Sequence, residues 1–277
     1  YDVHEYYGLV YAERLGIGGA PGRWLNRAVN RYQVRAARRV GGVNAAAEGI
    51  AELFKDAGVP VIVTLNAPLG AQFQGLEVAP FHERATKVVH IGTLNESYGM
   101  RRLLRIAAAA QARGLPHSFD FVDRFHNASE REAFEACFAE LGRPSNVKLV
   151  PPRPAHQVGE LLAEYGVGLA VFTKAGQNNL AQPGKLFEYS LMGLAVVATK
   201  AAAQERFLDR WAVARICPEE QIEGFVDALE ELAGQASQLD GLIAERMATA
   251  RQQLTWESIS SPKLMSLYRQ LINGAQA

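Results

Sequence analysis

Short apolar runs alternate with longer amphipathic segments from residue 87 to about residue 200. The runs are rich in Val, Leu and Phe, as buried strands are, and the segments between them carry apolar residues at helical spacing. This alternation predicts right-handed crossovers and a parallel sheet covered by helices on both faces. The expected strands are "KVVHIG", "SFDFV", "NVKLV", "VGLAVF" and "LAVVAT", and two more helices are expected near 219–234 and 240–253.

The first 70 residues repeat the alternation on a smaller scale. Residues 23–40 place apolar side chains at helical spacing with arginines between them, which predicts an amphipathic helix whose basic face is solvated. A short strand "GGVN", a helix "AAAEGIAELFKDAG" and a buried strand "VPVIVTLN" are expected to follow. The opening "YDVHEYY" is typical of the end of a strand, so we expect a fragment of a longer protein.

Between these two regions, the chain is rich in Gly, Pro and isolated aromatic residues, which predicts a linker between lobes. The predicted organisation is an α/β protein with the C-terminal part of one Rossmann-like lobe at 1–70 and an interlobe linker at 71–86. A complete Rossmann-like lobe is expected at 87–253, and a closing segment with a C-terminal helix at 254–277. Ligands of such sheets bind outside the carboxyl ends of the strands.

The composition argues against several classes of binding partner. Lys plus Arg and Asp plus Glu both number 29, so the chain as a whole has no electrostatic attraction to nucleic acid or to an anionic membrane. Its two cysteines, Cys137 and Cys217, have neither disulfide-framework nor metal-ligand spacing. Both are expected to be small core residues of a reducing compartment, so we expect a cytoplasmic protein. The apolar runs are too short to span a membrane.

The stretch "QPGKLFEYSLMGLAVVATK" carries the most specific candidate chemistry. Pro183 and Gly184 allow a ligand to approach the backbone, and Lys185 begins a helix whose free N–H groups favour a phosphate. Glu188, three residues later on the same face, can accept hydrogen bonds from two ribose hydroxyls. The pattern therefore predicts a clamp for a nucleotide diphosphate. The alternative is a surface ion pair between Lys185 and Glu188 that only stabilises the helix.

The same stretch resembles the donor-site signature of retaining glycosyltransferases with the GT-B fold, family 4, whose members commonly read Pro-x-Lys-x-x-Glu-Tyr. Further segments are similar in the same order: "VVHIGTLNESYGMRRLLRIA" to the opening of the donor domain, "TWESISSPKLMSLYRQL" to its closing segment and "YDVHE" to a strand end of the acceptor domain. The similarity extends over nearly the whole chain, although only Pro183 to Val197 is specific. It implies a GT-B fold with two Rossmann-like lobes and parallel sheets, of which the N-terminal lobe is incomplete.

By this resemblance, the phosphates of the donor would bind Lys185 and lie against Gly92, and the ribose would bind Glu188. Thr93 stands where the family often has Arg and would belong to the donor site. Asn178 and Asn179 would hydrogen-bond the donor sugar, and His4, as the catalytic candidate, would face that sugar from the opposite lobe. No metal or other cofactor is implied, since the lysine and the helix N-terminus would supply the positive charge.

The implied activity is retaining transfer of a sugar from a nucleotide diphosphate sugar to a hydroxyl acceptor in polysaccharide or glycoconjugate synthesis. The implied partners are the donor and a glycan or lipid-linked acceptor, without nucleic acid. Peripheral contact with the inner face of a membrane, through the missing N-terminal region, is a further implication.

Two alternatives remain open. A nucleotide-sugar-binding module without transferase activity is favoured by Thr93 and by Leu180, which stands where the family has an acidic residue. A nucleotide-sugar epimerase of the same fold would need carboxylates and a histidine around the anomeric carbon. Only His4, Glu5 and His90 are candidates for that role.

Overall fold

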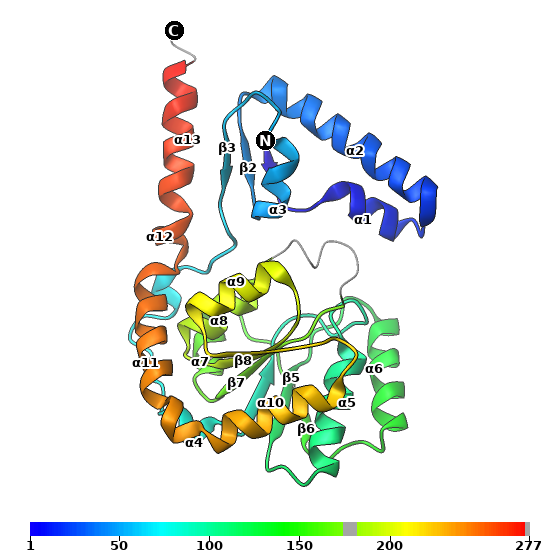
Figure 1. Cartoon of the computed structure of the whole chain (residues 1–277), viewed down its shortest axis with the longest axis vertical. Helices are drawn as coiled ribbons and strands as arrows, with labels where there is room; N and C mark the ends of the chain where they lie inside the picture. Colours follow the sequence, from blue (N-terminus) through cyan, green and yellow to red (C-terminus); the bar gives the residue numbers. More distant parts are fainter. Residues whose placement is uncertain (174–181, 275–277) are drawn as a thin grey trace. The chain divides into compact units, whose positions relative to one another are not determined.

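A computed structural model describes residues 1–173 and 182–274. The chain divides into two compact units (Figure 1). The small unit comprises residues 1–67 and the C-terminal residues from 253 onward, and the large unit comprises 68–174 and 184–252. Asn178 and Asn179 lie outside the described residues.

The small unit contains a three-stranded parallel sheet in the order β1-β2-β3. Val3, Val43, Ala45 and Phe54 are fully buried in its core, together with Ala37. Its elements are β1 (Asp2–Val3), α1 (Tyr7–Arg14), α2 (Gly19–Val40), β2 (Val43–Ala45), α3 (Glu48–Ala51), the short 3-10 helix η1 (Glu52–Phe54), β3 (Val61–Val63), α12 (Trp256–Ile259) and α13 (Ser261–Gly274). The expected helix, strand, helix and strand are confirmed, whereas α1 was not expected.

The C-terminal helix joins the small unit through contacts with β3 and the turn before β2. The Lys263 ammonium donates a hydrogen bond to the carbonyl of Val63 at 3.2 Å. Leu267 and Leu271 approach the α-carbon of Gly42, so a side chain at that position would meet both leucines. The last helix therefore covers the strand that precedes the predicted linker.

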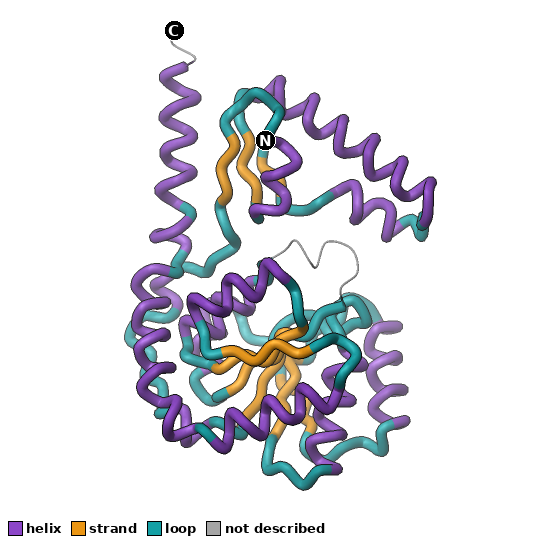
Figure 2. Tube along the Cα trace, in the orientation of Figure 1, coloured by secondary structure: helices purple, strands orange, loops and turns teal. Residues whose placement is uncertain are grey.

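The large unit is built on six parallel strands in the order β6-β5-β4-β7-β8-β9. Figure 2 shows these strands in orange with helices around them. The strands are β4 (Lys87–His90), β5 (Ser118–Val122), β6 (Val147–Val150), β7 (Val167–Ala170), β8 (Ala195–Thr199) and β9 (Ala214–Cys217). The five strands expected from apolar runs are confirmed, and β9 is an addition at the edge.

The helices of the large unit complete two layers around the sheet. They are η2 (Gly70–Gln72), α4 (Phe81–Arg84), α5 (Met100–Ala112), α6 (Ala128–Glu140), η3 (Ala155–Gln157), α7 (Val158–Leu162), α8 (Gly184–Leu191), α9 (Ala202–Trp211), α10 (Ile222–Gly234) and α11 (Ala236–Gln253). Helix α5 packs against α6 and α10, while α8 packs against α7, β7 and β8. Within the described residues no helix has the length and apolar character needed to cross a membrane.

The expected linker segment is packed onto the large unit. Phe81 is 2% exposed and belongs to the main core of this unit. Arg84 is 3% exposed, and its guanidinium donates to the carbonyls of Ala79 at 2.9 Å, Gly193 at 2.7 Å and Tyr165. Because Tyr165 and Gly193 lie just beyond α7 and α8, this arginine satisfies carbonyls at the ends of two helices.

Arg84→Ala is expected to lower the free energy of unfolding by about 3 kcal/mol, because it leaves several buried carbonyls without donors. Burial lowers the pKa of this arginine to about 10, so it carries its charge at neutral pH in the folded protein. Denaturant unfolding measures the loss, and the exposed Arg206→Ala is the matched control. A change as small as that of the control would contradict the capping role.

Candidate functional site

The candidate site lies where β4, β7 and β8 end, at the carboxyl edge of the large sheet. The loop after β4 contains Gly92 and Thr93, and both are partly exposed. Helix α8 begins at Gly184 and brings Lys185 to this edge. In open parallel sheets, crevices outside the strand ends are the usual ligand sites. The fold therefore brings together the segments that the family resemblance predicted to be neighbours.

Lys185 lies between the loops that follow β4 and β7. Its ammonium nitrogen is 3.4 Å from His90 Nε2 and 4.9 Å from the centre of the Phe172 ring. Burial lowers the pKa of this lysine to about 7, although the nearby Glu188 carboxylate acts in the opposite direction. Among the described residues Lys185 forms no ion pair. A buried cation without an ion-pair partner at the carboxyl edge of a parallel sheet is typical of an anion site.

Gly92 has a backbone conformation that favours glycine, with φ of 119°. A β-carbon placed on Gly92 would lie 3.0 Å from the Lys185 ammonium nitrogen and 3.3 Å from its ε-carbon. The absence of a side chain thus leaves room for the lysine at the end of β4. The family resemblance placed Gly92 and Lys185 in one site, and the structure brings them close together. Their roles toward a ligand remain predictions.

His90, the last residue of β4, contacts the Lys185 ammonium. It is fully buried, and its Nδ1 lies 3.1 Å from the carbonyl oxygen of Leu169. Burial, with a further contribution from the Lys185 charge, holds the pKa of His90 well below its usual value. The imidazole is therefore neutral, with its proton on Nδ1, so Nε2 accepts a hydrogen bond from the Lys185 ammonium. From the sequence, His90 was a candidate only for the epimerase alternative.

His90→Phe is expected to lower the pKa of Lys185 by about one further unit, because it removes a hydrogen bond that favours the charged amine. His90→Gln keeps an acceptor at this position and is expected to show a smaller shift. An NMR titration of the lysine side chain measures both. Equal pKa values in the three proteins would show that His90 has no effect on the lysine.

Glu188 lies one turn of α8 after Lys185. Burial raises the pKa of its carboxyl, and the positive charge of Lys185 opposes that rise. The two residues do not form the surface ion pair of the alternative interpretation, since the lysine is directed to His90 instead. A partly desolvated carboxylate three residues from the cation suits hydrogen bonds from ligand hydroxyls.

Tyr189 is an important residue of this helix that sequence reasoning did not single out. Its side chain is fully buried, and its hydroxyl accepts a hydrogen bond from the Ile91 amide at 3.2 Å and donates one to the Leu169 carbonyl at 3.4 Å. These contacts join α8 to β7 and to the loop that contains Gly92. The tyrosine in the Glu-Tyr pair of the motif was the available signal.

The catalytic candidate His4 lies in the small unit, just after β1. Its Nε2 is 3.0 Å from a carboxylate oxygen of Asp2, and the histidine side chain is 57% exposed. The structure does not place His4 relative to Lys185, so its role remains a prediction.

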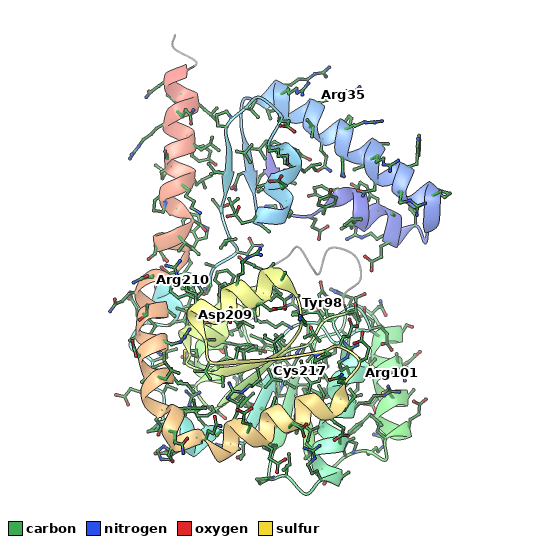
Figure 3. The ribbon with its side chains drawn as sticks, viewed as in Figure 1. Arg35, Tyr98, Arg101, Asp209, Arg210 and Cys217 are labelled. Atoms are coloured by element: carbon green, nitrogen blue, oxygen red, sulfur yellow. The ribbon has the colours of Figure 1, made fainter. Side chains whose placement is uncertain are left out.

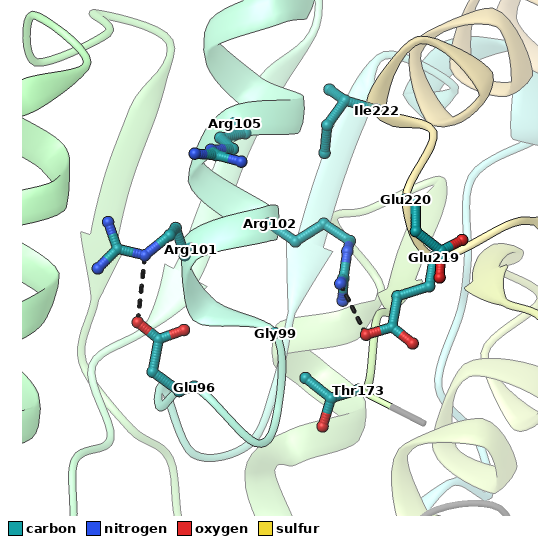
Figure 4. Close-up of a pocket in the computed structure, with 9 residues that line it drawn as sticks. All are labelled: Glu96, Gly99, Arg101, Arg102, Arg105, Thr173, Glu219, Glu220 and Ile222. Carbon is teal, nitrogen blue, oxygen red and sulfur yellow. Dashed lines mark hydrogen bonds and ion pairs between the residues drawn. The ribbon is translucent and has the colours of Figure 1, made fainter. Parts of the chain in front are cut away.

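A separate pocket of about 190 Å³ opens near the N-terminus of α5 (Figure 4). Three of its lining residues are arginines and three are glutamates: Arg101, Arg102, Arg105, Glu96, Glu219 and Glu220. Arg101 pairs with Glu96 at 3.2 Å, and Arg102 pairs with Glu219 at 2.8 Å. Because its charges compensate one another, this pocket differs from the surroundings of Lys185.

The described residues contain no cluster of three His, Cys, Asp or Glu side chains that could hold a metal ion. Independence from metal ions remains a prediction from the family resemblance.

No family model and no curated protein sequence matches this chain. Solved structures do match, over almost its full length. Anabaena Alr3699/HepE in complex with UDP-glucose has 16% sequence identity and a TM-score of 0.71, with 97% of this chain and 72% of that chain covered. A glycosyltransferase from Rickettsia africae has 9% identity and a TM-score of 0.68, with 95% and 79% covered. This is the GT-B fold.

A third similar structure also has the GT-B fold. It is the UDP-forming α,α-trehalose-phosphate synthase from Burkholderia xenovorans in complex with glucose-6-phosphate. It has 14% identity and a TM-score of 0.66, with 96% of this chain and 72% of that chain covered. The fold class predicted from the sequence is confirmed, with parallel sheets of three and six strands. At these identities, the comparisons establish the fold alone.

Proposed function

We propose that this chain belongs to a glycosyltransferase that moves a sugar from a nucleotide diphosphate sugar to a hydroxyl acceptor. The observation that carries the proposal is the Lys185 ammonium, which lies at the sheet edge beside Gly92 and without an ion-pair partner among the described residues. A departing nucleotide diphosphate develops negative charge, and a positioned cation at a helix N-terminus stabilises that charge.

The described residues would supply several parts of a donor site. Lys185 would bind the diphosphate, and the open backbone of Gly92 would let a phosphate oxygen approach closely. Glu188 would accept hydrogen bonds from the ribose hydroxyls, and Thr93 would contribute a hydroxyl to the same site. His4, from the small unit, remains the proposed residue that faces the donor sugar.

Similar structures support a nucleotide-sugar substrate. HepE was solved with UDP-glucose and also with UDP and glucose, and TarM of S. aureus was solved with UDP and α-GlcNAc-glycerol. We extend the proposal to transfer with retention, as in family 4, and to polysaccharide or glycoconjugate synthesis on a glycan or lipid-linked acceptor. In this scheme, Lys185 and the α8 N-terminus take the part that a metal ion plays in other transferases.

Incubation with UDP-glucose, or with a GDP-sugar, tests the proposal through release of the nucleotide diphosphate. We expect release to increase when a hydroxyl acceptor is added, and proton NMR of the product to show the anomeric configuration of the donor. Inversion would overturn the assignment to a retaining enzyme. Failure to bind any nucleotide diphosphate would overturn the proposal itself.

The second candidate, a nucleotide-sugar-binding module without transferase activity, predicts a different result. The same titrations would give binding of UDP or GDP, but no nucleotide would be released from the sugar donor with acceptor or with water. Thr93 favours this candidate, because the family often has an arginine where this chain has a neutral side chain.

A further inference from the structure

An aromatic ring lies against the Lys185 ammonium, where a buried lysine more often meets a carboxylate. The ammonium nitrogen lies over the ring of Phe172, 4.9 Å from its centre. A cation within about 6 Å of a ring centre is attracted by the negative face of the π-system. In the described part of the chain, no Asp or Glu forms an ion pair with this lysine. The ring is therefore the main group, besides His90, that attracts the cation to this place.

The backbone of Phe172 is fixed on both sides. Its amide donates a hydrogen bond to Thr199 Oγ1 at 3.0 Å, and its carbonyl accepts one from the Arg102 guanidinium at 3.4 Å. Figure 4 shows Arg102 reaching from α5 toward Glu219, with which it forms an ion pair at 2.8 Å. The segment after β7 is thus joined to the end of β8 and to α5.

The ring of Phe172 is fixed as well. It is 4% exposed, and it meets the ring of Tyr98 edge to face, with 6.0 Å between the ring centres and 78° between the planes. Tyr98, labelled in Figure 3, belongs to the loop between β4 and α5. Thr173 adds a hydrogen bond from its hydroxyl to the carbonyl of Ser97 in the same loop, at 3.1 Å. These contacts determine which way the face of the Phe172 ring is directed.

We propose that Phe172 is a positioning residue of the proposed donor site, and that its ring holds the Lys185 ammonium in place of a carboxylate. The inference rests on the proposed function in that the ligand of the lysine is a nucleotide diphosphate. A carboxylate would also attract the lysine, but it would cancel the positive charge and repel a phosphate. An aromatic ring attracts the ammonium and has no net charge, so the charge stays available to the ligand.

Two titratable groups face the ammonium among the described residues: His90 at the end of β4 and Glu188 on α8. The pKa of His90 lies well below its usual value and that of Glu188 is raised, in both cases mainly by burial. Phe172 does not titrate, so its ring favours the charged amine at every pH. Removing that attraction should therefore lower the pKa of Lys185.

Fluorination of the ring tests this role in the full 277-residue chain. Trifluorophenylalanine, introduced at position 172 alone, weakens the negative face of the ring but changes its shape little. Without any ligand, we expect the pKa of Lys185, measured by NMR titration, to fall by roughly one unit. The same replacement of Phe187, whose ring packs against Phe207 at 4.7 Å, is the matched control. Equal pKa values in the two fluorinated proteins would overturn the proposal.

Calorimetric titration with UDP and with GDP extends the test to the proposed ligand. Fluorination at position 172 should weaken binding roughly tenfold at pH 8 and about twofold at pH 6, because a lower pKa removes more of the lysine charge at the higher pH. Unchanged affinity at both pH values would overturn the inference and leave the proposed function intact. If the unmodified chain binds neither nucleotide, the proposed function fails, and the ligand-free NMR titration still decides the role of Phe172.

Phe172→Glu separates attraction of the lysine from neutralisation of its charge. The carboxylate should raise the pKa of Lys185 above its value of about 7, yet weaken binding of UDP or GDP roughly tenfold or more. Phe172→Gln is the neutral control and should leave the pKa lower than in Phe172→Glu. A Phe172→Glu protein that binds the nucleotide as tightly as the unmodified chain would contradict the proposal. Circular dichroism verifies that both variants are folded, and the fluorinated protein tests the same role if they are not.

Discussion

Lys185→Ala is expected to weaken binding of UDP or GDP by roughly 100-fold or more, because it removes the cation that faces the diphosphate. Lys185→Arg keeps the positive charge and is expected to retain part of the affinity. The exposed Lys148→Ala is the matched control for loss of one charge. Calorimetric titration measures all four proteins, and unchanged affinity in Lys185→Ala would remove the lysine from the site.

The affinity for UDP or GDP is expected to fall as the pH rises. The pKa of Lys185 is about 7 without ligand, so the amine is charged below that pH and loses its proton above it. A bound diphosphate favours the charged form, so affinity should fall as the pH rises above 7 and proton uptake should accompany binding near pH 8. The Lys185→Ala protein should show neither effect. A pH-independent affinity would contradict this assignment.

The stability of a Lys185 variant shows whether its loss of nucleotide binding results from misfolding. Because burial lowers the pKa of Lys185 in the folded chain, its charged form opposes folding at every pH below the unfolded value of 10.5. This free-energy cost is fully present below pH 7 and disappears as the pH approaches 10.5, the pKa of the lysine in the unfolded chain. Lys185→Met should therefore raise the melting temperature at neutral pH while it abolishes nucleotide binding. Functional sites often keep residues that lower the stability of the folded protein.

Sequence patterns identified the central strands because these strands are continuous apolar runs. Strand β9 was missed for a physical reason: it pairs only with β8, and half-buried Arg215 interrupts its apolar pattern. Arg215 forms an ion pair with Glu231 of α10 at 2.8 Å, a placement that suits an edge strand. Helix α9, before this strand, was missed together with it.

The candidate site was predictable only in part. The motif located Lys185 and Glu188, since their spacing on one helix face is visible in the sequence. His90 could not be found in this way, because its contact with Lys185 spans 95 positions and depends on the pairing of β4 with β7. Likewise, nothing local in the sequence shows that Tyr189 bonds to the loop before Gly92. Predictions of roles for His4, Asn178 and Asn179 remain untested.

Gly168→Ala should destabilise the large unit by about 3 kcal/mol, a large effect for the addition of one methyl group. A β-carbon at Gly168 would lie 2.5 to 2.7 Å from three atoms of the Tyr189 ring. Both residues are buried, and Gly168 sits in the middle of β7 between β4 and β8, so neither the strand nor the ring has room to move. Denaturant unfolding measures the loss.

A double-mutant cycle separates this clash from a general intolerance of side chains in β7. Tyr189→Leu removes the ring and its two hydrogen bonds and is expected to be destabilising by itself. In that background, Gly168→Ala should cost roughly 1 kcal/mol, because the added methyl group then enters the space left by the ring. Additive effects would show that the glycine is required for another reason. Strong coupling would show that β7 carries a glycine to admit Tyr189, the residue that ties the helix of Lys185 to the loop of Gly92.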